Sequence, residues 1–312
     1  MTTVGLISIG VLQALILLLA APLFSGFARV MRAKMHSRKG PPIRQNYLDI
    51  IKLMKRQEVI SEQASWVFRA TPYISMAAML LVALLVPFLA VVSPLGAAGD
   101  LILVVYLFAL PRVFFSLAGL DSGSTFGGIG GRRELLVAAL IEPILLLVVF
   151  VLALLAGSTN LGTISSKVAT GELPYTLAFW LSLAAFAFTT FVEMGKLPFD
   201  LGEAEQELQE GPLTEYSGRS LAIAKWSIYL KQLVLVALFL GLFLPFGSMT
   251  TLSPLGALVS VLAFFVKAIL FYFVVAVLEN AMARMRFMKV PAATWLALGA
   301  AVLSFVFYLA NI

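Results

Sequence analysis

The sequence predicts an all-α integral membrane protein, a single polytopic domain over residues 1–312 with about eight transmembrane helices and an amphipathic interfacial helix after the first. Hydrophobic residues make up 61% of the chain and charged residues only 12%, whereas a soluble domain has about 25% charged residues. Apolar stretches of about 20 residues, the length that spans a bilayer, recur throughout the chain. These stretches are too long for barrel strands and do not alternate, which excludes a β-barrel pattern.

The spans are expected at residues 4–27, 71–92, 101–120, 135–156, 173–192, 221–246, 254–278 and 291–310. The first stretch has no basic region before it, and its apolar run from Val4 to Phe27 is too long for a signal peptide. We therefore interpret it as a retained first helix.

Basic residues fall on alternate loops of this arrangement. Segment 28–70 contains ten Lys or Arg, and loops 121–134 and 279–290 add Arg132, Arg133, Arg284, Arg286 and Lys289. The opposite loops 93–100, 157–172 and 247–253 contain only one basic residue, Lys167. The positive-inside rule then predicts that loops 28–70, 121–134, 193–220 and 279–290 are cytoplasmic and that both termini face outward. The net charge of +6 is thus assigned to membrane orientation and not to nucleic-acid binding.

The chain has no cysteine and one histidine, His36. This composition excludes disulfides, thiolate metal sites and Cys-ligated iron–sulfur clusters within the chain. We expect no metal, no cofactor and no catalytic centre here, so any redox cofactors would belong to partner proteins.

The first basic loop contains a predicted amphipathic helix over Gln45–Gln57, which would lie in the membrane interface. Its charged side and the preceding turn have two interpretations: they set topology beside anionic headgroups, or they dock a soluble partner. The docking candidates are Arg38, Lys39, Asp49, Lys52 and Arg56.

Segment 193–218 is unusually acidic. Asp200 is expected to cap a short helix over residues 201–210, with Glu203 completing a capping box. Glu203, Glu207 and Glu210 would then share one helix face, where like charges repel. The stripe is either a solvated surface or the lining of a cavity, where crowded carboxyl groups would have raised pKa values and could pass protons. The carboxylates are Glu193, Asp200, Glu203, Glu205, Glu207, Glu210 and Glu215.

Four charged residues lie well inside predicted spans: Arg112, Glu142, Lys231 and Lys267. Each would cost at least about 2.5 kcal/mol if it faced lipid near the bilayer centre. They are expected to face the bundle interior, either as structural ion pairs or as a charged axis that carries protons. Pro143, directly after Glu142, would free a backbone carbonyl beside the carboxyl group.

Segment 193–200 (EMGKLPFD), continuing through the carboxylates to Thr214-Glu215-Tyr216, resembles the signature of the NADH dehydrogenase subunit 1 family, the membrane subunits at the arm junction of complex I and its relatives. The turn from Arg38 to Pro41 before segment 49–53 (DIIKL) resembles the family's first cytoplasmic loop, and Glu142 its membrane glutamate. The acidic segment and residues 120–124 (LDSGS) are most similar to the hydrogenase branch, the membrane subunits of formate hydrogenlyase and hydrogenase 4.

The resemblance implies a membrane anchor and proton-pathway subunit of a membrane-bound nickel–iron hydrogenase, in the cytoplasmic membrane of a prokaryote. The implied partners are the hydrogenase large and small subunits, iron–sulfur proteins and an antiporter-like membrane subunit, with the nickel–iron centre and the iron–sulfur clusters on the partners. The implied proton-path residues are Glu142 and the acidic-segment carboxylates other than Glu210, and Lys196 stands where the family usually has Arg. Glu210 is a further candidate from the acidic segment itself. Arg112, Lys231 and Lys267 join them as buried charges.

Three alternatives remain open at this point: a quinone-site subunit of an NADH:quinone oxidoreductase, a stand-alone ion transporter, and a purely structural anchor. The residues do not identify the electron donor, which could be formate, carbon monoxide or ferredoxin. They also leave open whether protons are pumped or only supplied.

Overall fold

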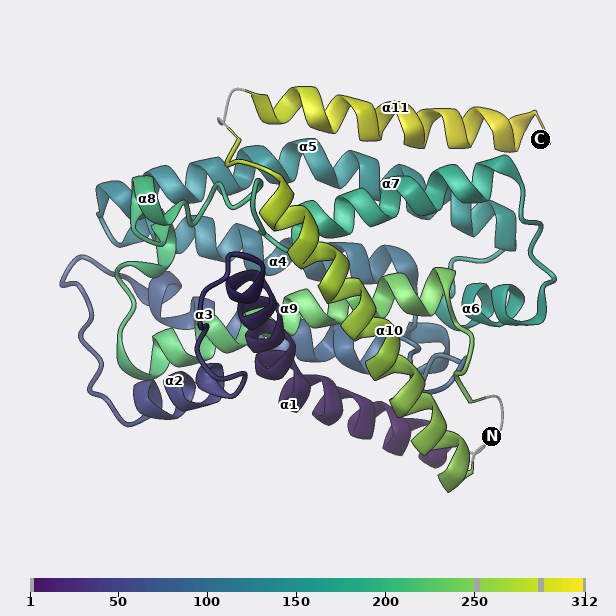
Figure 1. Ribbon diagram of the computed structural model, residues 1–312, viewed down its shortest axis with the longest axis horizontal. Helices are drawn as coiled ribbons and strands as arrows, with labels where there is room; N and C mark the ends of the chain where they lie inside the picture. The colour runs from purple at the N-terminus through teal and green to yellow at the C-terminus, as the bar shows by residue number, and fades with distance from the viewer. Residues whose placement is uncertain (1–2, 250–252, 286–288, 311–312) are drawn as a thin grey trace.

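The computed structural model describes residues 3–249, 253–285 and 289–310, and its helices run mostly parallel to one long axis (Figure 1). Among these residues, seven helices are long and apolar enough to cross a membrane. The eighth apolar helix, α7, has 17 residues and extends over about 26 Å, close to the thickness of the hydrocarbon core. The prediction of an all-α membrane protein with about eight spanning helices is therefore confirmed.

The helices are α1 Thr3–Met35, α2 Gln45–Met54, α3 Trp66–Leu85, η1 Gly96–Ala98, α4 Leu101–Asp121, α5 Thr125–Ala156, α6 Leu161–Thr170, α7 Leu177–Glu193, α8 Glu205–Leu208, η2 Gly211–Leu213, α9 Gly218–Phe243, α10 Pro254–Ala281 and α11 Val290–Leu309. The predicted spans correspond one to one with α1, α3, α4, α5, α7, α9, α10 and α11. Some bounds were wrong: α1 and α5 extend well beyond their apolar runs, and α3 lies nearer the N-terminus than residues 71–92.

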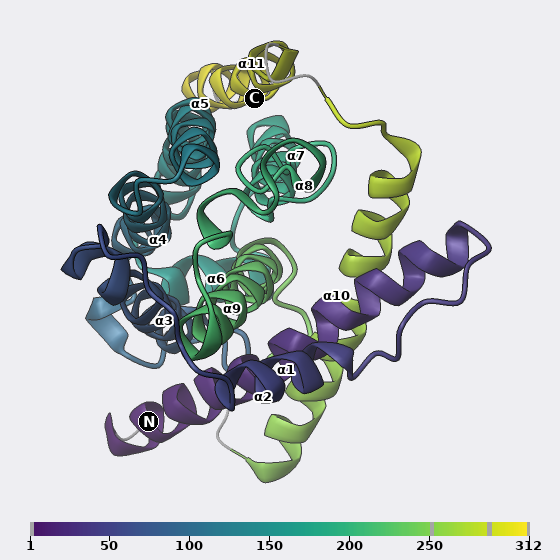
Figure 2. The same cartoon turned by 90° about the vertical axis from the view of Figure 1, so that its left-hand side faces the viewer.

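One end of the bundle carries α2, α8 and the loops 36–44, 55–65 and 194–217, and we call it the basic end (Figure 1). Helix α6 and both ends of the described chain lie at the opposite end. Viewed from the basic end, α3, α4, α5, α7, α9 and α11 are seen end-on, while α1, α2 and α10 are strongly tilted (Figure 2).

Helix α9 is the centre of the bundle, and every residue from Gln232 to Phe243 is buried. It is apolar on all sides in this stretch, as expected of a helix surrounded by others. Its partners are α1, α2, α3, α6, α7 and α10. Side chains on one face of α9 therefore reach the centre of the protein, where polar groups need partners.

The first helix contains Pro22, which removes the backbone donor for the carbonyl of Leu18. Trp226 of α9 supplies a replacement, since its Nε1 donates to Leu18 O at 2.9 Å. Two side chains of α2 bind the same region: Asn46 Nδ2 donates to Pro22 O at 3.2 Å, and the Tyr47 hydroxyl donates to Leu19 O. Two hydrogen bonds thus attach α2 to α1 next to Pro22.

The interfacial helix ends at Met54, three residues earlier than predicted, and it lies across the basic end of the bundle (Figure 2). Asn46 and Ile50 are its buried residues, whereas Ile51 and Met54 are exposed.

Glycines let the acidic loop 194–217 approach α5 closely. A Cβ on Gly130 would lie 2.7 Å from Gly202 O and 2.8 Å from Pro212 Cδ, and one on Gly211 would lie 2.0 Å from Gly202 O. Gly211 also has a φ of +56°, which favours glycine. This backbone contact positions the loop's carboxylates over the ends of α4, α5 and α9.

Candidate functional site

Three adjoining cavities lead from the basic end into the bundle. The funnel, about 1530 Å³ with its open mouth, lies among α1, α9, the end of α10 and the acidic loop. The inner cavity, about 780 Å³ with the space that is open to solvent, lies among α4, α5, α9 and the same loop. The midspan cavity is narrow, with room for about one water molecule, and lies among α4, α5, α7 and α9. Asp200 and Glu203 line both of the first two, and Arg112 and Glu193 line both of the last two.

A buried ionic cluster joins the inner and midspan cavities. The Arg112 side chain is 3% exposed; its Nε donates to Glu134 Oε1 at 2.9 Å and its Nη2 donates to Glu193 Oε2 at 2.8 Å. Lys231 Nζ lies 3.1 Å from the same Glu193 oxygen. Two cations thus face two carboxylates, and this pairing offsets the cost of removing each charge from water.

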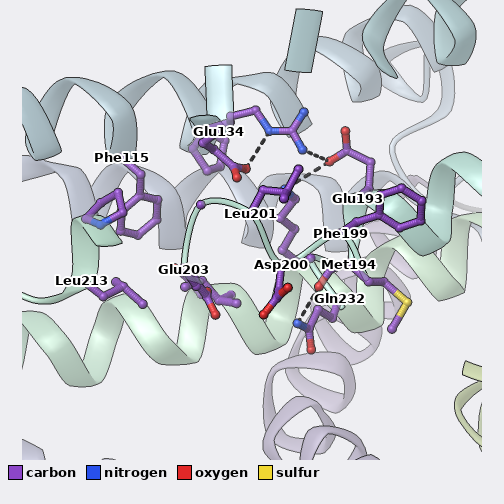
Figure 3. A pocket seen from close by; sticks show the side chains of 18 of the residues that line it. Phe115, Glu134, Glu193, Met194, Phe199, Asp200, Leu201, Glu203, Leu213 and Gln232 are labelled. Atoms are coloured by element: carbon purple, nitrogen blue, oxygen red, sulfur yellow. Dashed lines mark hydrogen bonds and ion pairs between the residues drawn. The ribbon is translucent and has the colours of Figure 1, made fainter. Parts of the chain in front are cut away.

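Figure 3 shows Glu134 and Glu193 on either side of the guanidinium group that binds them both, with Asp200 and Glu203 farther along the cavity wall. Gln232 extends the polar lining, and its Nε2 donates to Met194 O at 2.9 Å. The four labelled carboxyl groups come from α5, α7 and the acidic loop and line the same inner cavity, although they are far apart in the sequence.

Glu142 lines the midspan cavity together with Arg112 and Glu193. Among the residues described, Glu142 has no hydrogen bond or ion pair. Its carboxyl group interacts electrostatically, over a longer distance, with the charges of Arg112, Glu193 and Lys231. Pro143 follows it, so the carbonyl of Ala139 lacks its helical donor. A carboxyl group beside a free carbonyl is a suitable site for an ordered water molecule.

The funnel wall carries three ion pairs. Lys225 Nζ lies 3.1 Å from Glu210 Oε1, Arg32 Nη1 lies 3.4 Å from Glu279 Oε1, and Arg284 pairs with Asp200.

Glu203 lies between the funnel and the inner cavity and is half-buried. Burial raises the pKa of its carboxyl group to about 7, with smaller opposing effects from Lys196 and Lys225 and reinforcing effects from Glu134 and Glu210. Glu203 therefore changes its protonation state near neutral pH, which suits a group that accepts and releases protons.

We predict that a protonated carboxyl group titrates near pH 7 and disappears in Glu203→Gln. The measurement is the infrared carbonyl band of the neutral acid between pH 5 and 9. The pKa of Glu203 is about 7 in the folded protein, and its ordinary value is 4.5. Protonation of Glu203 therefore makes its full contribution to the stability of the folded state below pH 4.5. This stabilisation is lost as the pH rises through 7, so Glu203→Gln should also flatten the pH dependence of unfolding in that window.

Glu207→Gln is the matched control, because the Glu207 side chain is 52% exposed and pairs with Arg133 at 2.6 Å. A band that persists in Glu203→Gln and vanishes in Glu207→Gln would contradict the assignment.

The cavities bring together many of the candidates expected from the sequence and leave others apart. Those that line a cavity are Arg112, Glu142, Glu193, Asp200, Glu203, Glu210 and Lys231. Glu207 is exposed, Glu215 lines none of the three cavities, and the side chain of Glu205 lies outside the described part of the structure. Lys267 donates to the carbonyls of Leu244 at 2.8 Å and Phe246 at 2.9 Å, so it binds the end of α9.

The predicted helix over residues 201–210 was wrong. Helix α8 covers only Glu205–Leu208, and Gln209 and Glu210 have positive φ angles of 50° and 78°. Asp200 caps no helix there, since its side chain binds Arg284. The expected single face of Glu203, Glu207 and Glu210 is therefore absent. Glu203 lies at the boundary between two cavities, Glu207 lies on the exposed surface, and Glu210 lies in the funnel wall.

Sequence reasoning missed Glu134, Arg284 and Gln232. Glu134 was counted as part of a basic loop, but α5 begins at Thr125, so Glu134 lies two turns before Glu142 on one helix face. That spacing was the available signal. Nothing in the sequence indicated that Arg284 would reach Asp200. In the described residues, no group of three or more His, Cys, Asp or Glu is arranged to hold a metal ion.

Comparison with known proteins gives a consistent relationship. The family model described as NADH dehydrogenase matches residues 7–310. The chain is 49% identical to formate hydrogenlyase subunit 4 of Escherichia coli K12 over 96% of this chain and 97% of that protein, and 49% identical to hydrogenase-4 component C of the same organism over 96% and 95%. A chain of the archaeal membrane-bound sulfane sulfur reductase has the same fold, with a TM-score of 0.82 at 24% identity over 95% of this chain and 98% of that one. The resemblance to the hydrogenase branch is confirmed, and the chain belongs to the NADH dehydrogenase family.

Proposed function

We propose that this chain is the membrane anchor and proton-pathway subunit of a membrane-bound nickel–iron hydrogenase complex of the formate hydrogenlyase type. The observation that carries the proposal is the row of three adjoining cavities, which links Asp200 and Glu203 at the basic end to Glu142 inside the membrane through the Arg112–Glu193–Lys231 cluster. A carboxyl group inside a bilayer is costly unless it is hydrated or paired, so this placement favours a role in proton movement over a purely structural one.

In this proposal each residue has a distinct task. Glu203 exchanges a proton with the funnel, since its pKa of about 7 populates both forms. Arg112 and Lys231 hold Glu193 in place between the inner and midspan cavities. Water in the two cavities carries the proton past this cluster, and Glu142 receives it at the inner end of the route. A change in charge on the docked redox partner would shift these protonation equilibria through the same ionic cluster.

The proposed orientation follows from charge, and the proposed partners follow from the relatives of the chain. The basic end, with its exposed Arg38, Lys39, Lys52 and Arg56, is proposed to face the cytoplasm by the positive-inside rule and to dock the hydrogenase and iron–sulfur subunits. Asp49 accepts a hydrogen bond from Gln45 at 2.8 Å and stays half-buried on α2. An antiporter-like membrane subunit would bind laterally in the cytoplasmic membrane. The nickel–iron centre and iron–sulfur clusters are assigned to the soluble partners, because this chain contains no cysteine.

Glu142→Gln tests the proposal. In inverted membrane vesicles, hydrogen evolution driven by a reduced viologen should continue at the rate of the unaltered complex, because the soluble partners carry that chemistry. Proton uptake into the vesicles, followed with a pH-sensitive dye, should fall at least tenfold, because glutamine cannot release a proton.

Glu172→Gln is the control, since Glu172 is exposed at the opposite end of the bundle and lines none of the three cavities. If Glu142→Gln leaves both hydrogen evolution and proton uptake unchanged, the chain is a structural anchor and the proton pathway is wrong. Purification without iron-containing partners would favour a stand-alone transporter instead.

A further inference from the structure

The funnel has more basic side chains than its carboxylates can pair. Arg32, Lys225 and Arg284 have partners in Glu279, Glu210 and Asp200. Arg29 and Lys196 also line the funnel, and neither makes an ion pair within the described residues. Glu203 is the remaining carboxyl group in the wall. The funnel therefore has a net positive charge even when every one of its carboxylates is ionised.

Arg284 adds unused hydrogen-bond donors. One of its nitrogens, Nη2, bonds to Asp200, whereas its Nε and Nη1 are buried and have no partner in the described structure. A buried donor without a partner costs about 1–3 kcal/mol. An anionic oxygen beside the guanidinium would satisfy these donors, and guanidinium groups bind phosphate oxygens in a bidentate manner.

The depth and sides of the funnel favour a lipid as the source of that oxygen. Arg29 lies just beyond Phe27, where the uncharged run of α1 ends, which is the level of the phospholipid headgroups. Helix α10 packs on α1 and α9, and Figure 2 shows it standing apart from α7 and α11. Leu197, Asp200 and Arg284 border the funnel together, so apolar and charged side chains lie next to one another in its wall.

We propose that the funnel binds the phosphate of an anionic glycerophospholipid, held by Arg29 and Lys196 beside the guanidinium group of Arg284. Basic pockets between spanning helices are suited to anionic headgroups. Leu197, Leu213 and Ile228 give the same funnel an apolar wall for the acyl chains of the lipid. This site shares the funnel with the conduction proposal, but it depends on the bases of the funnel, and its test measures lipid binding and not proton movement.

The test uses the full-length chain purified with the proteins that accompany it, stripped of lipid and titrated with phosphatidylglycerol. Native mass spectrometry then counts the lipid retained on the released subunit. We expect at least fivefold tighter binding of phosphatidylglycerol than of zwitterionic phosphatidylcholine. The double variant Arg29→Gln/Lys196→Gln should weaken phosphatidylglycerol binding at least tenfold.

Arg69→Gln/Lys55→Gln is the matched control, because both residues are exposed, lie toward the basic end and do not line the funnel; it should bind like the unaltered chain. Arg29→Lys/Lys196→Arg keeps both charges and should keep the lipid, which separates lost binding from misfolding. Equal retention by the double variant and the control overturns the proposal, as does equal binding of phosphatidylcholine. Full competition by soluble glycerol phosphate at the same concentration would assign the site to a free phosphate ester and overturn the lipid assignment.

Discussion

Arg112→Met should lower the free energy of unfolding by about 3–5 kcal/mol, the usual cost of removing one partner from a buried ion pair. Arg112 is 3% exposed and binds both Glu134 and Glu193. Without it, Glu193 would keep only Lys231, and Glu134 would lose its ion pair. The measurement is equilibrium unfolding of the detergent-solubilised protein by titration with sodium dodecyl sulfate.

Two companion variants make this prediction specific. Arg69→Met removes an exposed arginine and should change the free energy by less than about 0.5 kcal/mol. Arg112→Met combined with Glu193→Gln should recover part of the loss, because the buried charge is removed together with its partner. Equal stability of Arg112→Met and Arg69→Met would mean that the cluster is hydrated well enough to need no pairing.

Gly211→Ala should destabilise the protein by about 2–6 kcal/mol, the sum of a strained left-handed residue and an overpacked contact. Gly211 has a φ of +56°, and its added Cβ would lie 2.0 Å from Gly202 O. The contacted oxygen belongs to the backbone, so no flexible side chain can move aside. The acidic loop would lift from α5, and the infrared band assigned to Glu203 should shift or broaden along with the loss of stability.

Gly157→Ala separates the two contributions. Gly157 also has a positive φ, +65°, but nothing lies within 4 Å of the position of its Cβ. This variant should cost about 1 kcal/mol from backbone strain alone. If both substitutions cost the same, the close approach between Gly211 and Gly202 is not a significant contact.

Hydropathy predicted the spanning helices because lipid imposes one strong rule, that each crossing satisfies its own backbone hydrogen bonds over about 20 apolar residues. The same rule places charged residues such as Arg112 and Glu193 toward the interior. It does not fix where a helix ends outside the bilayer. Helix α5 therefore continues to Thr125 through Gly127 and Arg132, in a region where hydropathy predicted a loop.

The acidic loop could not be derived in the same way. Local capping rules favoured a helix from Asp200, but the tertiary contact with Arg284 and the close packing of Gly202 and Gly211 determine its path. Lys267 shows the same limit for a residue inside a span. Its depth predicted a place among the buried charges, whereas its ammonium group binds the carbonyls at the end of α9, a partner that side-chain patterns do not reveal.

The contacts at Pro22 have a mechanical consequence. Three neighbouring carbonyls near the middle of α1 are held by Trp226, Asn46 and Tyr47, the last two from α2. Helix α2 is therefore coupled to the turn of α1 that precedes Arg29 and Arg32, two residues of the funnel wall. A displacement of the surface helix α2 would move these two side chains with it.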